Sequence, residues 1–111
     1  MHKYFVSPKD IKGSCYYEFY KGKWDEKTFW KEDSICIDDN DWCDCDFLDI
    51  LMKYAPNYDP FGETEISKLQ WQQIKTDCLL SGGKSAAIAK EADEWMVDTF
   101  SKYSVFTILG I

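Results

Sequence analysis

The chain has 111 residues, of which 45% are hydrophobic and 17% aromatic, and its formal net charge is −7. This length suits a single domain over residues 1–111, and the hydrophobic content excludes a disordered chain. The 13 basic residues are all lysines and are outnumbered by 20 acidic residues, so we expect no direct binding of nucleic acid. The apolar runs fall far short of the roughly 20 residues that span a bilayer, and the first residues lack the apolar core of a secretory signal. We therefore expect a cytoplasmic protein that does not bind membranes.

Five cysteines form an odd set without regular spacing: Cys15, Cys36, Cys43, Cys45 and Cys78. Such a set predicts reduced thiols in a reducing compartment. Zinc ligands are usually spaced more widely than Cys43-x-Cys45, and the single imidazole, that of His2, belongs to the chain terminus. We therefore expect no metal site and no cofactor.

The first third of the chain has the features of β-strands. Residues 14–20 are rich in strand-forming side chains, and Gly22 follows them where a tight connection needs positive φ. Residues 24–30 are interpreted as a partner strand and residues 34–37 as a shorter third strand. Together they predict an antiparallel meander.

From Asp38 the hydrophobic pattern changes to the period of a helix. Five residues recur at helical spacing and define the predicted buried face: Cys43, Phe47, Ile50, Leu51 and Tyr54. Pro56 ends this helix, and residues 57–62 have the Asn, Asp, Pro and Gly content of a loop.

Two more helices and a closing strand are predicted after this loop. Ser67-x-x-Gln70 matches the capping box, so a helix begins near Lys68 and ends at the Ser81-Gly82-Gly83 stop. Its buried residues are predicted to be Trp71, Ile74 and Cys78. Residues 105–109 are β-branched and apolar, as in a buried strand.

The longest helix is predicted over residues 85–103. Its core stripe consists of Ile88, Ala92, Trp95, Met96, Thr99 and Tyr103, and its water-facing residues are Lys90, Glu91, Glu94, Asp98 and Lys102. The order of elements predicts an α+β fold, in which a small antiparallel sheet of N-terminal strands plus a C-terminal strand packs against about three helices.

Residue types required for catalysis are scarce. Gly83-Lys84-Ser85 is similar to the end of a phosphate-binding loop, but Cys78 stands where the first glycine is required, so a helix stop followed by a cap explains these residues better. Nucleophilic catalysis needs a base beside the nucleophile, and His2 is the only imidazole. No carboxylate pair stands out. We assign no catalytic residues and expect no enzyme.

The segment 38–49, here called the acidic segment, is the most unusual part of the sequence. It contains six aspartates and no lysine: Asp38, Asp39, Asp41, Asp44, Asp46 and Asp49. A calcium loop is unfavourable, because Trp42 and Cys43 would occupy the fifth and sixth positions of its register. Two interpretations stay open. In the first, some carboxylates cap a helix, with Asp39 or Asp41 as the N-cap, and the rest are solvated. In the second, a cationic partner binds this face. Trp42 is then an anchor for the partner, or else it packs in the core.

A second candidate surface is the 57–66 loop, which alternates aromatic and acidic groups. These are Tyr58, Asp59, Phe61, Glu63 and Glu65. Loops that expose aromatic side chains are often functional, whereas aromatic side chains in loops commonly fold back onto the core.

The chain resembles the small acidic immunity proteins of bacterial polymorphic and contact-dependent growth-inhibition toxin systems. The resemblance lies in the size, the acidic segment, Phe61-Gly62-Glu63-Thr64-Glu65-Ile66-Ser67 leading into Trp71 and Ile74, and Glu94-Trp95 before the terminal Ile108-Leu109-Gly110-Ile111. It implies a cytoplasmic, non-catalytic inhibitor that occludes a cognate basic toxin, often a nuclease. No binding residue is transferred from the family.

We therefore expect a toxin inhibitor that acts by protein–protein interaction. The predicted partner-binding residues are Asp38, Asp39, Asp41, Trp42, Asp44, Asp46, Asp49, Tyr58 and Phe61. The alternatives are a nucleic-acid-mimicking inhibitor of a DNA- or RNA-binding protein, a small enzyme that uses paired carboxylates, and a homo-oligomeric scaffold. The sequence leaves open the partner, self-association, the strand order, and whether the acidic segment or the 57–66 loop is the interface.

Overall fold

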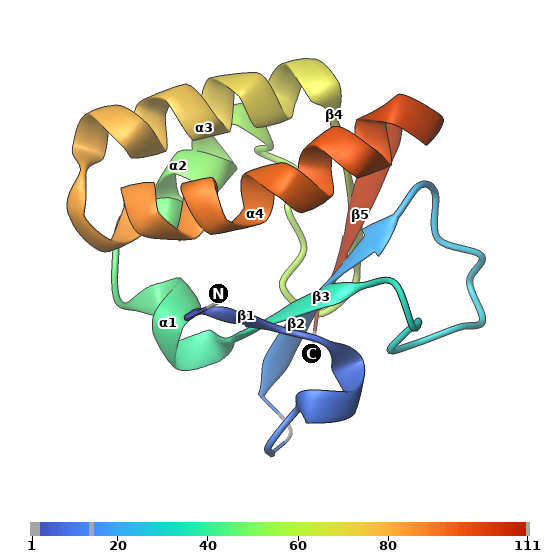
Figure 1. Ribbon diagram of the computed structural model, residues 1–111. Helices are drawn as coiled ribbons and strands as arrows, with labels where there is room; N and C mark the ends of the chain where they lie inside the picture. The colour runs from blue at the N-terminus through green and yellow to red at the C-terminus, as the bar shows by residue number, and fades with distance from the viewer. Residues whose placement is uncertain (1–2, 14, 111) are drawn as a thin grey trace.

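The computed structural model describes residues 3–13 and 15–110. Over these residues it forms an antiparallel five-stranded sheet with helices, which confirms the predicted α+β fold (Figure 1). The two longest helices lie side by side over one face of the sheet. None of the helices in the described part of the chain is both long enough and apolar enough to cross a membrane.

The sheet has the strand order β1-β3-β2-β5-β4. Its strands are β1 (Phe5–Val6), β2 (Tyr16–Lys21), β3 (Ile35–Asp38), β4 (Glu63–Ser67) and β5 (Val105–Leu109). The helices are the 3-10 turn η1 (Pro8–Asp10), α1 (Asp39–Cys43), α2 (Phe47–Tyr54), α3 (Lys68–Ser81) and α4 (Gly83–Lys102). The C-terminal strand β5 therefore lies inside the sheet, between β2 and β4.

Three of the predicted strands are confirmed, and one is wrong. The predicted strands at 14–20, 34–37 and 105–109 correspond to β2, β3 and β5, with Ser14 outside the described residues. Residues 24–30 form a loop, so β2 pairs with β3 directly, with Tyr17 opposite Ile37. The strands β1 and β4 were not predicted, and both lie at edges of the sheet.

Local hydrogen bonds keep residues 24–30 out of the sheet. The Asp25 carboxylate accepts bonds from the backbone N–H groups of Lys27 (2.9 Å) and Thr28 (2.7 Å), which closes a tight turn. Glu26 and Trp30 have φ of 65° and 58°, values incompatible with an extended strand. The side chain of Asp25 thus competes successfully with strand pairing.

The predicted helix that starts at Asp38 is broken into α1 and α2. Trp42 and Phe47 are both buried in the core, yet five residues of continuous helix would separate their directions by about 140°. The break at residues 44–46 lets both side chains face inward. As a result Cys43, predicted to be buried, is exposed, whereas Leu51 is buried as predicted.

The last two helices follow their predicted positions closely. The Ser67–Gln70 capping box is present, and α3 buries Trp71, Ile74 and Cys78 as predicted. Helix α4 begins two residues before the predicted Ser85, directly after Gly82.

Two residues predicted to belong to this helix differ from the predicted pattern. Tyr103 lies just beyond the helix and is 41% exposed, because the core stripe ends at Thr99. Glu91 is half-buried rather than water-facing, since its Oε1 accepts bonds from the backbone N–H groups of Tyr4 and Phe5, both at 2.7 Å. This carboxylate ties β1 to α4.

Aromatic rings between the sheet and the helices form the centre of the core. Phe19 of β2 contacts Trp42 (centroids 5.7 Å apart) and Phe106 of β5 (5.2 Å). Trp71 of α3 packs edge-on against Phe106 at 6.2 Å. This cluster fixes α1 and α3 to the sheet.

Candidate functional site

The acidic segment is partly neutralised by the chain itself. Lys84, at the start of α4, forms ion pairs with Asp41 (3.0 Å) and Asp44 (3.1 Å). These two carboxylates raise the pKa of the Lys84 ammonium above its usual value, mainly through their hydrogen bonds. The lack of lysine within the segment therefore does not leave all six aspartates unpaired, because Lys84 of α4 pairs with two of them.

Two further aspartates of the segment have structural roles. The N-cap of α1 is Asp38, which accepts a bond from the N–H of Asn40 at 2.8 Å, and not Asp39 or Asp41 as predicted. Asp46 accepts a bond from the Ser81 hydroxyl at 2.9 Å. These bonds account for carboxylates that would otherwise have been free for a partner.

Asp39 and Asp49 differ in their burial. Burial raises the pKa of the Tyr17 phenol to about 12, and the half-buried Asp39 carboxylate adds to this shift. Asp49 is exposed. In the described residues, neither of these carboxylates forms an ion pair with a lysine. The segment thus keeps a net negative charge, although it is smaller than the sequence suggests.

Trp42 belongs to the core and is not accessible as an anchor. Its side chain is 0% exposed and stacks on Tyr17 with ring centroids 5.2 Å apart. Tyr58 is half-buried, and its ring lies 6.3 Å from that of Trp42. Burial raises the pKa of the Tyr58 hydroxyl. Of the three predicted aromatic contacts, only Phe61 lies on the surface, with 84% of its side chain exposed.

Hydrogen bonds from a side chain and from the backbone hold the turn that carries Phe61. The Asp59 carboxylate accepts a bond from the N–H of Phe61 at 2.9 Å, and the N–H of Gly110 donates to the carbonyl of Gly62 at 2.7 Å. A Cβ atom on Gly110 would lie only 2.2 Å from the carbonyl oxygen of Pro60, so this close approach requires glycine. The turn is thereby fixed against the end of β5.

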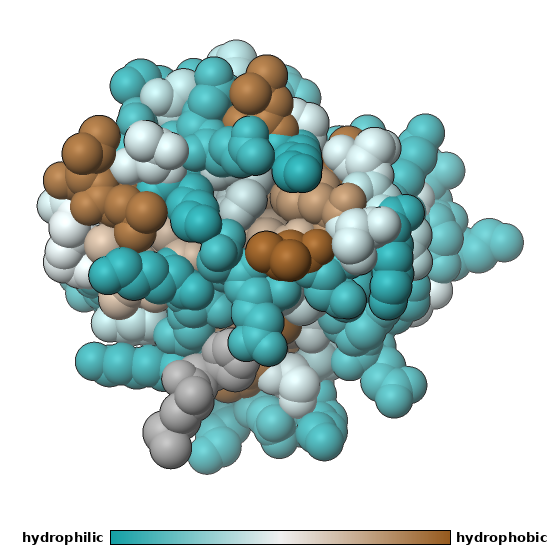
Figure 2. All heavy atoms as spheres, turned by 45° about the horizontal axis from the view of Figure 1, so that its top comes forward, coloured by the Kyte–Doolittle hydropathy of each residue, from teal (hydrophilic) through white to brown (hydrophobic). Residues whose placement is uncertain are grey.

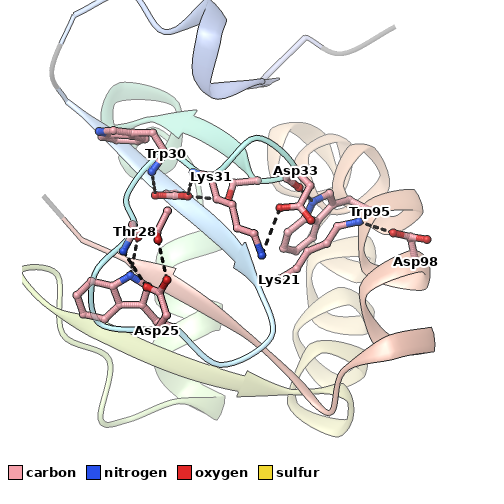
Figure 3. Close-up of polar contacts among 11 residues, drawn as sticks. Lys21, Asp25, Thr28, Trp30, Lys31, Asp33, Trp95 and Asp98 are labelled. Atoms are coloured by element: carbon pink, nitrogen blue, oxygen red, sulfur yellow. Dashed lines mark hydrogen bonds and ion pairs between the residues drawn. The ribbon is translucent and has the colours of Figure 1, made fainter.

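A second aromatic loop, residues 22–34, lies on the face of the sheet opposite the helices (Figures 1 and 3). The Trp24 indole N–H donates to the carbonyl of Thr28 at 2.7 Å, and its ring lies 5.1 Å from that of Phe29. Phe29 is 56% exposed. The sequence interpretation missed this loop because the same residues have strand-like composition; the signal that could have revealed it is Asp25, three residues before Thr28.

The base of this loop is attached to a buried carboxylate of β2. Glu18 accepts bonds from the N–H of Trp30 (2.7 Å), from the N–H of Lys31 (2.9 Å) and from the Ser34 hydroxyl (2.6 Å). Nearby, the indole N–H of Trp95 donates to the carbonyl of Asp33 at 2.8 Å (Figure 3). These bonds give the exposed aromatic residues of the loop a fixed support.

The two loops enclose a hollow of about 370 Å³, here called the aromatic hollow. It is lined by Trp24, Phe29, Asp59, Phe61, Gly62, Glu63, Leu109 and Gly110. Aromatic faces next to carboxylates form a setting that attracts a lysine or arginine side chain, through cation–π contact and ion pairing. The aromatic hollow brings together Phe61 of the predicted site and Trp24 and Phe29, which the prediction did not include.

Other hollows lie on the helical side of the molecule. A groove of about 410 Å³ lies between α3 and α4 over Trp71, Met96 and Phe100. A hollow of about 490 Å³ between α2 and α3 contains Asp46 and Asp49 of the acidic segment. Figure 2 shows that the apolar groups over these helices are separate patches with hydrophilic side chains between them.

The five cysteines differ in burial. Cys36 and Cys78 are buried thiols whose pKa values burial raises to about 12. No group of three His, Cys, Asp or Glu side chains that could hold a metal ion occurs within residues 3–13 and 15–110. His2 lies outside the described residues.

Comparison with known proteins identifies no relative. No family model matches the chain, and no curated protein or solved structure matches it either.

Proposed function

We propose that this chain is a non-catalytic inhibitor that binds a basic toxin domain in the cytoplasm, as the immunity proteins that it resembles do. The observation that carries this proposal is the aromatic hollow, where exposed aromatic side chains on hydrogen-bonded loops lie beside Asp59 and Glu63. The centre of the interface is then the predicted 57–66 loop together with residues 24–29, and the acidic segment has a secondary role.

Exposed aromatic side chains on fixed loops are typical of binding hot spots. Phe61 and Phe29 each leave most of their ring in water, which is unfavourable in the free protein and favourable once a partner covers it. Because hydrogen bonds to Asp59 and Asp25 already order their loops, little conformational entropy is lost on binding.

Charge favours a cationic partner for the aromatic hollow. The chain has a formal charge of −7, and the hollow contributes two carboxylates next to three aromatic rings. An arginine or lysine of the partner would gain both ion pairing and cation–π contact there. The aspartates of the acidic segment add to the long-range field that attracts such a partner.

The experiment pairs this chain with the C-terminal domain encoded by the reading frame immediately upstream in its genome. We expect co-expression to restore growth and to give a stable complex during purification. Phe61→Ala is compared with Leu80→Ala, since the two side chains are 84% and 81% exposed but Leu80 lies beside Asp46 and Asp49.

The two variants distinguish the possible interfaces. We expect Phe61→Ala to raise the Kd about tenfold or more and Leu80→Ala to change it less than about twofold. The reverse order would place the interface at the acidic segment. Failure of the upstream domain to bind or to be neutralised would contradict the proposed function itself.

A further inference from the structure

Strand β4 leaves part of its backbone unpaired at the edge of the sheet. It pairs with β5 on one side only, with Thr64 opposite Ile108 and Ile66 opposite Phe106. The Gly110 N–H bonds to the Gly62 carbonyl, so Gly62 and every second residue after it direct their backbone groups toward β5. Glu63 and Glu65 therefore direct their N–H and C=O groups away from the sheet.

The start of α3 agrees with this alternation. The N–H of Ser67, two residues after Glu65, bonds to the Gln70 side chain at 2.8 Å rather than to β5. For Glu63 and Glu65, no hydrogen bond of the backbone on the outer side is formed within the described part of the chain. Two N–H and two C=O groups are thus available at the spacing that a neighbouring strand requires.

Acidic side chains flank these free backbone groups. Glu63 and Glu65 are exposed and share the sheet face on which Leu109 and Thr107 lie opposite them in β5. Glu63 also lines the aromatic hollow, beside Phe61. The free edge and the hollow therefore form one continuous surface.

We propose that an extended basic segment of the partner adds to β4 as a sixth strand and inserts a cationic side chain into the aromatic hollow. Alternate lysines or arginines of this segment would lie beside Glu63 and Glu65, as in favourable cross-strand pairs. A second copy of this chain is an unfavourable occupant, because its own Glu63 and Glu65 would face these carboxylates. The inference rests on the proposed function for the identity of the partner, but its test does not.

The probe is a blocked nine-residue peptide of alternating lysine and valine. In NMR titrations at millimolar peptide, we expect saturable shifts of the Glu63 and Glu65 amides and slower hydrogen exchange at both, by about tenfold or more. The Thr64 and Ile66 amides, already bonded to β5, should change less. The same peptide with N-methyl groups on alternate residues keeps its charge but loses backbone donors, so it should not bind. If it causes the same shifts as the unmethylated peptide, binding depends on charge alone and the inference is overturned.

A matched pair of variants tests the backbone directly. Glu65→Pro and Glu65→Gln both remove the charge, but only proline removes the outward N–H, which the β4–β5 ladder does not use. We expect Glu65→Pro to bind the peptide at least tenfold more weakly than Glu65→Gln. If Glu65→Pro does not fold, the alternation of amide protection in the unaltered chain decides the question.

The results separate this inference from the proposed function. If the upstream toxin domain binds, but Glu65→Pro and Glu65→Gln bind it and the peptide equally, strand addition is wrong and the inhibitor function stands. If the peptide adds to β4 but the toxin domain does not bind, the function is wrong and the strand-binding edge stands. If the protein forms a concentration-dependent dimer that Glu65→Pro abolishes, the strand that pairs with β4 comes from a second copy of this chain. That result would overturn the proposal of a basic partner segment.

Discussion

Glu18 is the residue that most clearly links the core to the candidate site. It is 1% exposed and its carboxylate is satisfied by two backbone N–H groups and a hydroxyl from the 22–34 loop. A buried carboxylate is unfavourable unless all its bonds are made, so this loop has one preferred position over the sheet. The aromatic hollow depends on that position.

Replacing Glu18 by Gln should destabilise the protein. The amide has one acceptor oxygen, and its NH₂ group would face donors from Trp30, Lys31 or Ser34. We expect the free energy of unfolding in urea to fall by about 2–3 kcal/mol. Glu65→Gln, the same change at an exposed site, is the control and should have almost no effect; an unchanged Glu18→Gln midpoint would contradict the anchoring role.

Asp25 gives the loop a defined dependence on pH. Bonds from the Thr28 hydroxyl, from its N–H and from the Lys27 N–H lower the pKa of Asp25 from 3.8 to about 2. Because the folded pKa lies below the unfolded one, this stabilisation is present above about pH 4 and is lost as the pH falls toward 2. The Thr28 amide shift should titrate with a midpoint near 2, and Asp25→Asn should abolish that titration; a midpoint near 4 would show that the turn is not held by the carboxylate.

At the scale of elements, local signals explain some boundaries and packing explains others. The capping box fixed the start of α3, and the Gly82 stop fixed its end. The break between α1 and α2 contains no glycine or proline. It is explained by packing, because the break allows both Trp42 and Phe47 to be buried. Strand β4 has the alternating burial of an edge strand, which a period-two interpretation of Glu63-Thr64-Glu65-Ile66 could have found.

The capping box of α3 should contribute measurably to stability. The Ser67 hydroxyl accepts a bond from the Gln70 N–H at 3.2 Å, and the Gln70 side-chain oxygen accepts one from the Ser67 N–H at 2.8 Å. We expect Ser67→Ala to lower the free energy of unfolding by about 1 kcal/mol in thermal or urea denaturation. Thr76→Ala, in the exposed middle of the same helix, should have little effect, and equal losses for both would argue against a specific cap.

At the scale of the whole molecule, two groups of carboxylates bear on where a cationic partner binds. The acidic segment lies at α1 and α2, whereas Asp59, Glu63 and Glu65 lie at the 57–66 turn and edge strand. Lys84 reduces the first of these fields by pairing with Asp41 and Asp44. The second combines its charge with exposed aromatic rings, which is why the proposed interface lies there.

Association with the basic toxin domain should be strongly dependent on salt. We expect the association rate constant to fall by about tenfold or more between low and physiological ionic strength, as screening weakens the attraction. Lys84→Gln changes the formal charge from −7 to −8 and should raise the rate at low salt without changing the dissociation rate. Stopped-flow mixing measures both rates, and a rate constant that is independent of salt would contradict electrostatic attraction.

The sequence by itself determined the features that depend on neighbours in the chain. These are the α+β class, the helices α3 and α4 and the buried strand β5, because periodicity, caps and glycine stops act over a few residues. Tertiary structure decided the position of the 22–34 loop over the sheet, the helix break, the burial of Trp42 and the pairing of Lys84 with the acidic segment. Each of these depends on contacts between residues far apart in sequence, such as Glu18 with Trp30 or Lys84 with Asp41, and composition carries no information about such contacts.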